Sequence, residues 1–274
     1  VKQITTTHDL MEWHSLKIFR YYKNRSLKEN FYFFRQKAYL WAVYRLGLSF
    51  SDHVLTISQY SKRDITQSFP KLKNKSSYVY HGIPSGFKPP LNNTSKQGVL
   101  MLGGDSHQKN PENMLKAWAQ LPKELQKAHP LTILGFVGGE DSIISKTIRA
   151  LGIENDIVLK GWVTEDELIQ AMQTSKVFIF ASREEGFGFP LVQSMASGTP
   201  VVTSEADVLI EIGQDAVCSA KAEDFLALSS AVRSLLTDEK LYNEKVQKGL
   251  TISSKFTWEH TAEHIASTYL TLLK

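Results

Sequence analysis

A loop with two glycines between an acid and a proline offers the clearest chemistry in this 274-residue chain. The segment EEGFGFPLVQ places Glu185 before Gly186 and Gly188, and Pro190 follows at the expected start of a helix. Glycines let the backbone approach a ligand closely, and a helix N-terminus favours an anion. A carboxylate accepts hydrogen bonds from sugar hydroxyls. The segment therefore predicts a ligand site, although such a loop before a helix is also common as a simple tight connection.

A second glycine loop lies in the segment GGDSHQKNPENML, which begins with Gly103 and Gly104. Lys109 stands immediately before Asn110, the expected cap of a helix that has Pro111 at its first position. A point charge beside exposed backbone amides suits a diphosphate. On its own, the same lysine is better explained as a solvent-exposed residue at a helix start.

These loops need strands that end beside them, and the sequence predicts such strands. Apolar runs predict strands over residues 99–104, 131–139, 156–163 and 176–182, with helices between them. This alternation favours a parallel sheet with helices on both faces. Open parallel sheets bind ligands at the carboxyl ends of their strands, where the glycine loops lie. Thr164 and Glu167 predict a capping box for the helix after the third of these strands.

The front of the chain predicts a second, smaller set of elements. Residues 1–7, 52–58 and 77–83 are expected strands, residues 27–47 an expected helix, and Ser58 an expected N-cap. Proline, glycine, asparagine and serine concentrate over residues 84–98, which predicts a linker between domains.

Charge differs between the two parts. Residues 1–90 contain 15 Lys and Arg but 5 Asp and Glu, while the rest of the chain is net acidic. A basic, aromatic front suits acidic lipid or a phosphate-bearing substrate, and a solvated helix face explains the pattern equally well. Nucleic acid is not expected, because no recognition motif accompanies the charge. Arg35, Lys37 and Arg45 interrupt the most apolar stretch, which argues against a spanning helix but leaves peripheral attachment open.

A single cysteine, Cys218, excludes an internal disulfide and favours a reducing compartment. We therefore expect a cytoplasmic protein, with the inner face of a membrane as its peripheral location.

Residues 184–202, EEGFGFPLVQSMASGTPVV, resemble the motif of the retaining glycosyltransferases of the GT-B architecture, family four or "group 1". The resemblance implies that Glu185 contacts the hydroxyls of the donor sugar. It also implies that the loop from Gly186 through Phe187, Gly188 and Phe189 binds the donor. Gln193 stands where the family usually has a second Glu that contacts the nucleotide ribose, so that contact is expected to be weaker.

Other segments resemble the family in the same order. The glycine loop at residues 103–109 resembles the family's diphosphate loop, which implies that Gly103, Gly104 and Lys109 bind the donor, although the family's usual Arg is missing. The segment LKGWVTEDEL resembles the one whose backbone holds the nucleobase, which implies donor binding by Gly161, Trp162 and Val163.

His8 and Asp9 resemble the family's His-Asp pair at the end of an acceptor-domain strand, which implies a catalytic His8 that faces the donor. The other histidines show no ligand spacing for a metal. We therefore expect neither a metal nor a cofactor.

The resemblance implies an α/β fold of the GT-B type with two Rossmann-like domains, the first incomplete. The expected domains are residues 1–88 on the acceptor side, residues 89–255 for the donor, and a helix over 256–274 that crosses back. Because the family's opening strand and glycine-rich loop are missing, we expect a fragment, a mis-started reading frame, or a protein that a second polypeptide completes.

The predicted function is transfer of a sugar, with retention, from a nucleotide-diphosphate sugar to a glycan or lipid-linked acceptor in surface polysaccharide biosynthesis. Two alternatives stay open. A non-catalytic or partner-dependent fragment would bind nucleotide without transfer, and a GT-B epimerase would release an altered nucleotide sugar.

Overall fold

The computed structural model describes residues 2–11, 27–91 and 95–273. Contacts between Cα atoms divide the chain into two units. The first combines residues 1–81, 185–187 and 259–274, and the second combines residues 82–184 and 188–258. The domain bounds at residues 88/89 and 255/256 stay a prediction.

The first unit is built on three short parallel strands in the order β1-β2-β3. These are β1 (Ile4–Thr6), β2 (His53–Thr56) and β3 (Ser76–Tyr78). The long helix α2 (Leu27–Phe50), the helix α3 (Gln59–Ser68) and the 3-10 turn η2 (Pro70–Leu72) accompany them. Their core consists of Leu10, Leu48, Val54, Ile65 and Leu72.

Two polar contacts fix the ends of elements in this unit. The Ser58 hydroxyl accepts a hydrogen bond of 3.0 Å from the Ser61 N–H, which confirms the predicted N-cap of α3. In the helix α12 (Trp258–Leu273), the Thr261 hydroxyl donates to the Tyr80 carbonyl at 2.7 Å.

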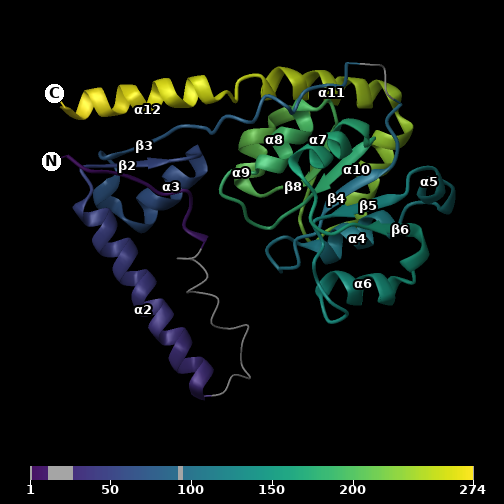
Figure 1. The fold of residues 1–274 in the computed structure, drawn as a ribbon, viewed down its shortest axis with the longest axis horizontal. Helices are drawn as coiled ribbons and strands as arrows, with labels where there is room; N and C mark the ends of the chain where they lie inside the picture. The colour runs from purple at the N-terminus through teal and green to yellow at the C-terminus, as the bar shows by residue number, and fades with distance from the viewer. Residues whose placement is uncertain (1, 12–26, 92–94, 274) are drawn as a thin grey trace. The chain divides into compact units, whose positions relative to one another are not determined.

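The second unit contains a six-stranded parallel sheet in the order β6-β5-β4-β7-β8-β9 (Figure 1). Its strands are β4 (Val99–Leu102), β5 (Leu131–Leu134), β6 (Ile157–Leu159), β7 (Val177–Phe180), β8 (Val201–Ser204) and β9 (Cys218–Ala220). All four residues of β7 are buried, as expected for a central strand covered on both faces.

Helices form a layer on each face of this sheet. One layer packs α4 (Pro111–Ala119) against α6 (Ile143–Leu151) and α10 (Phe225–Thr237). The other surrounds α8 (Phe189–Ala196) with α7 (Glu165–Thr174), α9 (Asp207–Gly213) and α11 (Glu239–Ser253). The short helix α5 (Lys123–Ala128) and the turns η3 (Glu154–Asp156) and η4 (Gln214–Ala216) complete the unit. Trp118, Ile133 and Ile179 are fully buried in its core.

The predicted strands are present but shorter than the runs that predicted them, and β9 was not predicted. The run 131–139 forms a strand only as far as Leu134, because Gly135 turns the chain with a φ of 75°, which extended backbone does not allow. The capping box of Thr164 and Glu167 at the start of α7 is confirmed.

Lys96 fastens the segment before β4 to two helix ends. Its ammonium group donates to the Gln173 carbonyl at 2.7 Å, the Ser197 carbonyl at 3.2 Å and the Thr199 hydroxyl at 2.7 Å. These acceptors lie at or just beyond the C-termini of α7 and α8, where a cation is favourable. Burial, with a smaller effect of the Lys176 charge, lowers the pKa of Lys96 to about 8.

Within the described part of the chain, none of the helices combines the length and apolar character needed to cross a membrane.

Candidate functional site

The candidate site lies where the sheet of the second unit reverses its strand order. From the central β4 the chain adds β5 and β6 on one side, then returns to add β7, β8 and β9 on the other. Because all these strands are parallel, their carboxyl ends meet at one edge of the sheet. Open α/β sheets bind ligands at this kind of switch point. The two predicted glycine loops leave β4 and β7, the strands that flank it.

The loop after β4 brings Gly103, Gly104 and Lys109 together. The Gly103 N–H donates to the Leu134 carbonyl at 2.7 Å, and a Cβ at Gly103 would lie 2.7 Å from the backbone of Phe136. A Cβ at Gly104 would lie 2.6 Å from the Lys109 Cγ. Glycine at both positions therefore permits this packing, and the lysine side chain lies directly against the Gly104 backbone.

Asp105 follows the two glycines in the loop after β4, where the family's usual Arg is missing. Its Oδ1 accepts a hydrogen bond of 3.0 Å from the N–H of Ile144 in the first turn of α6. This carboxylate therefore satisfies a helix N-terminus instead of binding an anion.

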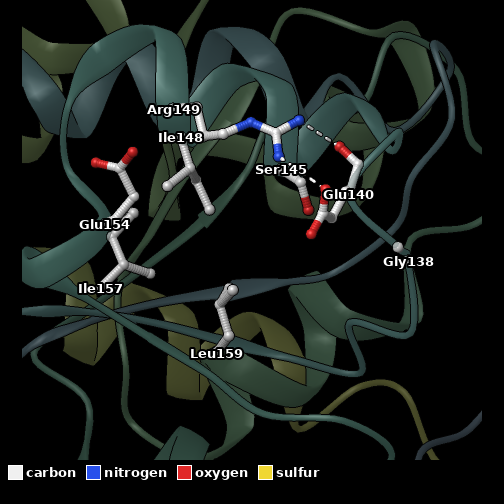
Figure 2. Close-up of a pocket in the computed structure, with 9 residues that line it drawn as sticks. Gly138, Glu140, Ser145, Ile148, Arg149, Glu154, Ile157 and Leu159 are labelled. Carbon is white, nitrogen blue, oxygen red and sulfur yellow. Dashed lines mark hydrogen bonds and ion pairs between the residues drawn. The ribbon is translucent and has the colours of Figure 1, made fainter.

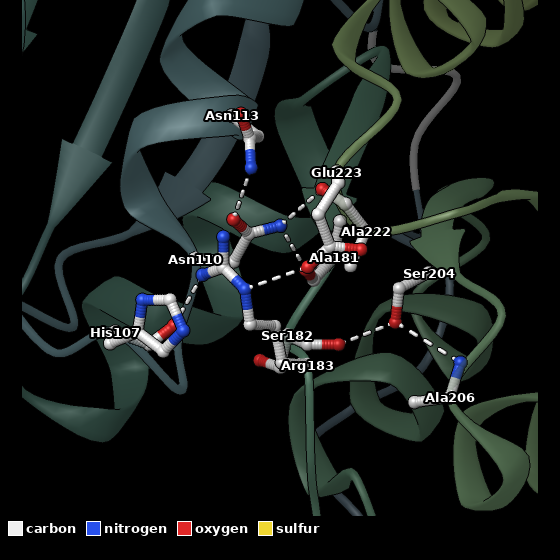
Figure 3. Close-up of polar contacts among 10 residues, drawn as sticks. All are labelled: His107, Asn110, Asn113, Ala181, Ser182, Arg183, Ser204, Ala206, Ala222 and Glu223. Atoms are coloured by element: carbon white, nitrogen blue, oxygen red, sulfur yellow. Dashed lines mark hydrogen bonds and ion pairs between the residues drawn. The ribbon is translucent and has the colours of Figure 1, made fainter. Parts of the chain in front are cut away.

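Pro111 starts α4 and Asn110 stands at its N-cap position, as predicted, but Asn110 has a φ of 57° and its side chain makes no capping bond. Its amide group donates instead to the carbonyls of Ala181 and Ala222, each at 2.8 Å (Figure 3). Asn113 in turn donates to the Asn110 Oδ1 at 2.8 Å. The Asn110 side chain thus joins the loops after β4, β7 and β9. It is available for these contacts because it makes no capping bond to α4.

Arg183 fastens the same two glycine loops, and sequence analysis missed it. Its backbone N–H donates to the Gln108 carbonyl at 2.8 Å, and its guanidinium group donates to the His107 carbonyl (Figure 3). The Nε also pairs with the Glu223 carboxylate at 2.9 Å, and the side chain is 18% exposed. Gln108 returns a hydrogen bond of 3.0 Å to the Glu184 carbonyl. No sequence signal marks Arg183, since it stands outside the glycine motif.

The start of α8 has the geometry that the motif predicted. Gly188 has a φ of 92°, and Pro190 lies in the first turn of the helix. The first turn contains no acid, so its N–H groups and dipole remain favourable for an anion. Gln193 is half-buried within the same helix.

The predicted nucleobase segment lies beside the loop after β5. The Gly135 N–H donates to the Gly161 carbonyl and the Phe136 N–H donates to the Lys160 carbonyl, both at 3.0 Å. Trp162 is 85% exposed and Val163 is half-buried. The structure therefore joins Gly161 to the neighbouring loop but leaves the indole ring of Trp162 without cover.

A separate pocket of about 400 Å³ lies between α6 and β6 (Figure 2). Ile148, Ile157 and Leu159 supply its apolar side chains, and the Arg149 guanidinium group donates to the Glu140 carbonyl at 2.6 Å. None of the predicted site residues lines it.

Another group of predicted residues lies in the first unit. His8 is exposed, and its ring centroid is 5.4 Å from that of His81, which is 5.8 Å from that of Phe187. Burial lowers the pKa of His81, and the neighbouring His8 lowers it further. The neutral form of His81 is therefore favoured beside His8. Sequence analysis assigned His81 no role.

Gly186 is held closely within this unit. The Ser58 hydroxyl donates to its carbonyl at 3.1 Å, and a Cβ at Gly186 would lie 2.6 Å from the Asp9 Oδ2. Glu185 beside it is buried, at 9% exposure. By their contacts Glu185, Gly186 and Phe187 group with the first unit, whereas the other predicted donor residues belong to the second.

In the described residues, no three His, Cys, Asp or Glu side chains are arranged to hold a metal ion. That neither a metal nor a cofactor is used stays a prediction. One of the histidines considered for it, His14, lies outside the described residues.

Comparison with known proteins gives consistent matches. The family model of glycosyl transferases group 1 matches residues 84–251. O-antigen chain mannosyltransferase B of Escherichia coli is 28% identical over 228 residues, which cover 79% of this chain and 60% of that protein. Serotype-specific mannosyltransferase WbdA of Escherichia coli is 31% identical over 220 residues, covering 79% of this chain and 25% of that protein. The chain thus spans less than two thirds of these curated relatives.

Solved structures match the chain over almost its full length. The glycosyltransferase WaaG, involved in lipopolysaccharide biosynthesis, matches 98% of this chain and 75% of its own with a TM-score of 0.75 and 15% identity. Anabaena Alr3699/HepE in complex with UDP-glucose matches 97% of this chain and 72% of its own, with a TM-score of 0.75 and 18% identity. These similarities show the fold, an α/β architecture of the GT-B type.

Proposed function

The chain belongs to the glycosyl transferases of group 1, and on that premise we propose that it moves a sugar from a nucleotide-diphosphate sugar to a glycan or lipid-linked acceptor. The observation that carries the proposal is the pair of glycine loops at the switch point of the second unit's sheet. Arg183 and Gln108 hold these loops together by hydrogen bonds, so the groups that we propose to bind the donor are positioned before any ligand arrives. Such preorganisation favours binding, because less conformational freedom is lost when the ligand binds.

Each predicted residue has a role in this proposal. Lys109 and the N–H groups at the start of α8 would neutralise the diphosphate, which carries the charge that the leaving group gains. Glu185 would hold the sugar through its hydroxyls, and Gly161, Trp162 and Val163 would contact the base. His8 would donate a hydrogen bond to the transferred sugar or the leaving phosphate.

We further propose a mannosyl donor and a surface polysaccharide as the product, because both curated relatives above are mannosyltransferases and one acts on O-antigen chains. Transfer with retention, independence of metals and cofactors, and a cytoplasmic location with peripheral attachment to the membrane belong to the same proposal. So does the division into an acceptor-side domain at 1–88, a donor domain at 89–255 and a terminal helix at 256–274.

A second candidate function is that of a chain that needs a second polypeptide for transfer. Such a chain would bind a nucleotide sugar without transferring the sugar by itself.

Thermal unfolding with UDP, GDP, dTDP and ADP tests the proposal. A ligand at about 100 times its dissociation constant adds roughly 2.7 kcal/mol to the free energy of unfolding. For chains of this size that is a rise of several degrees in Tm, at about 2 to 4 °C per kcal/mol. We expect one nucleotide to raise the Tm. Cooperative unfolding with no shift for any of the four would contradict the proposed donor site.

A transfer assay then separates the two candidate functions. Mannose transferred from the nucleotide sugar of the stabilising base supports the enzyme. Stabilisation without transfer supports the alternative in which the chain alone binds the nucleotide sugar but does not transfer the sugar.

A further inference from the structure

A cationic hollow lies in the first unit. None of the residues that line it has been given a catalytic or donor-binding role above. Its volume is about 540 Å³, in the usual range for small-ligand sites. The C-terminal turns of α2, the end of α3 and the segment between α3 and β3 form its walls. They contribute Arg45, Leu48, Ser49, Ser51, Ser68, Phe69, Pro70, Lys71, Leu72 and Lys75.

The charged lining is entirely positive. Arg45, Lys71 and Lys75 are exposed, and the hollow has no Asp or Glu in its lining. Among the described residues, none of these three cations forms an ion pair. Three like charges around one cavity repel each other unless an anion enters. The hollow is therefore electrostatically suited to a polyvalent anion.

Asp52, which interacts electrostatically with Lys75, also has other partners. Asp52 accepts a hydrogen bond of 2.8 Å from the Gln3 N–H and pairs with the Lys2 ammonium at 3.6 Å. The Gln3 bond and the charges of Lys2 and Lys75 lower the pKa of Asp52. Its carboxylate offsets part of the Lys75 charge, which leaves Arg45 and Lys71 without an acidic neighbour in the lining.

The rest of the lining is partly apolar and partly hydroxylic. Leu48 and Leu72 are buried and Phe69 is half-buried, so they form an apolar floor. The hydroxyls of Ser49 and Ser51 donate to carbonyls of the preceding turn of α2, at Arg45 and Gly47. The ligand class that combines these features is an anionic head with an apolar or carbon-bonded tail.

The hollow opens at the opposite edge of the sheet from the catalytic candidates. Ser51 precedes β2 and Lys75 precedes β3, so both lie at the amino ends of parallel strands. His8 and Asp9 follow the carboxyl end of β1, which runs parallel to β2. The phosphate of a ligand in the hollow would therefore lie toward the amino ends of these strands, whereas Leu48 also lines a second hollow that contains His8 and Asp9.

We propose that this hollow binds a phosphate ester, with the phosphate between Arg45, Lys71 and Lys75 and its carbon skeleton on Leu48, Phe69 and Leu72. An arginine guanidinium group can bind two phosphate oxygens at once, and the lysines add point charges. The inference goes beyond the proposed function and does not depend on the donor site.

The phosphate ester has two possible sources, a lipid headgroup or a soluble metabolite. The surface beside the hollow bears on the first. The Arg45 guanidinium group lies 5.8 Å from the centre of the Trp41 ring, and Trp41, Leu46 and Phe50 on the same helix are 51%, 53% and 75% exposed. Exposed aromatic and aliphatic groups beside cations are typical of surfaces that touch lipid.

Binding of two probes to the full chain tests the proposal. Glycerol phosphate is titrated by calorimetry, and vesicles of phosphatidylcholine with or without phosphatidic acid are tested by co-sedimentation. The double variant K71A/K75A removes two cations of the hollow. The matched control K127A/K240A removes two exposed lysines from α5 and α11 of the second unit.

We expect K71A/K75A to weaken binding by roughly thirtyfold, since each Lys near an anionic surface contributes about 1 kcal/mol. The control should bind like the wild type. A third variant, Ser68→Glu, places a carboxylate in the lining and should also abolish binding. Stabilisation by nucleotide, measured in parallel, should stay unchanged in all three variants, which separates this test from that of the donor site.

The outcomes divide clearly. Selective loss of glycerol phosphate binding without any binding of vesicles assigns the site to a soluble phosphate ester. Selective loss of binding to phosphatidic acid vesicles assigns it to a lipid headgroup. Equal losses in K71A/K75A and in the control, or no binding of either probe by the wild type, would overturn the proposal.

Discussion

At the scale of single residues, Glu185 stands out because burial of a carboxylate needs a reason. Among the residues that the structure describes, it is the one Asp or Glu in the buried class. A buried charge is retained where it has hydrogen-bonding partners. We propose that the hydroxyls of the donor sugar are among the partners of this carboxylate.

The substitution Glu185→Gln keeps the shape of the side chain and removes its charge. We expect transfer to fall by at least about a hundredfold, as when one preorganised polar group is removed from an active site. The Tm and the stabilisation by nucleotide should be retained. Glu184→Gln, at the exposed neighbouring position, is the matched control. Similar rates for both variants would rule out the sugar-binding role of Glu185.

Gln193 allows a prediction in the opposite direction. Gln193→Glu restores the acid that the family usually has in this turn of α8, and a carboxylate accepts a stronger hydrogen bond than an amide. If Gln193 contacts the ribose, nucleotide affinity should rise about fivefold, for a gain of about 1 kcal/mol. Calorimetric titration measures it, with Gln170→Glu on the exposed side of α7 as the control. An unchanged dissociation constant would remove Gln193 from the site.

The limits of sequence analysis are clearest at this scale. Gly103, Gly104, Lys109 and Gly188 could be proposed as donor-binding residues because glycine and a helix start are visible in the local sequence, and their role in binding stays a prediction. The role of Asn110 was misjudged because its acceptors, Ala181 and Ala222, lie 71 and 112 residues away. Nothing local distinguishes an asparagine that caps its own helix from one that joins distant loops.

At the scale of elements, hydrogen bonds of Arg183 and Gln108 join the loop after β4 to the loop after β7. Lys109 lies against Gly104 in the loop after β4. Hydrogen bonds of the Gln108 carbonyl and side chain to the loop after β7 hold this loop in place. Arg183 is therefore a positioning residue of the proposed donor site.

Substitution of Arg183 tests this. Arg183→Ala removes an ion pair with Glu223, whose side chain is 70% exposed, so this pair contributes less than about 1 kcal/mol. It also removes a hydrogen bond to the His107 carbonyl, which is worth about 1 to 3 kcal/mol when that acceptor is left unsatisfied. We expect a weaker nucleotide dissociation constant and a raised KM for the donor with a smaller effect on kcat. Arg183→Lys should recover part of the affinity, which a purely structural defect would not show. Nucleotide binding by Arg183→Ala at the wild-type level would contradict the positioning role.

Elements with strong local chemistry were predicted well. The capping box at Thr164, the N-cap at Ser58 and the proline starts of α4 and α8 all follow from side chains within one helical turn. The ends of strands were predicted less well, because a strand stops where its neighbour stops. Leu102 pairs with Leu134 at the end of β4 and β5, and the residues around neither leucine indicate this pairing.

At the scale of the whole chain, three half-buried histidines predict a loss of stability in acid. Burial lowers the pKa of His53, His81 and His129, and the charges of Lys62, His8 and Lys176, respectively, add to the effect. Below about pH 6.5 the unfolded chain therefore binds more protons than the folded one. The contribution of these histidines to the free energy of unfolding is fully present above that pH, and it decreases as the pH drops toward their pKa values in the folded chain.

Urea denaturation at about pH 7.5 and about pH 5.5 measures this dependence. His53→Gln, which can keep a hydrogen bond to the Ser77 hydroxyl, should reduce the loss between the two pH values. His264→Gln, at an exposed position of α12, should leave it unchanged. A stability that rises on acidification would contradict the predicted sign.

The parallel pairing of both sheets has a consequence for how the chain reaches its fold. Every strand pair in the described residues is parallel, so neighbours are joined by crossovers and never by a tight hairpin. The central pair sets Val99 against Val177, with two strands and several helices between them in sequence. Chains dominated by such distant contacts fold slowly and expose unpaired apolar strands while they do so. During synthesis on the ribosome, β4 must therefore wait for most of the second unit to emerge before its second neighbour exists.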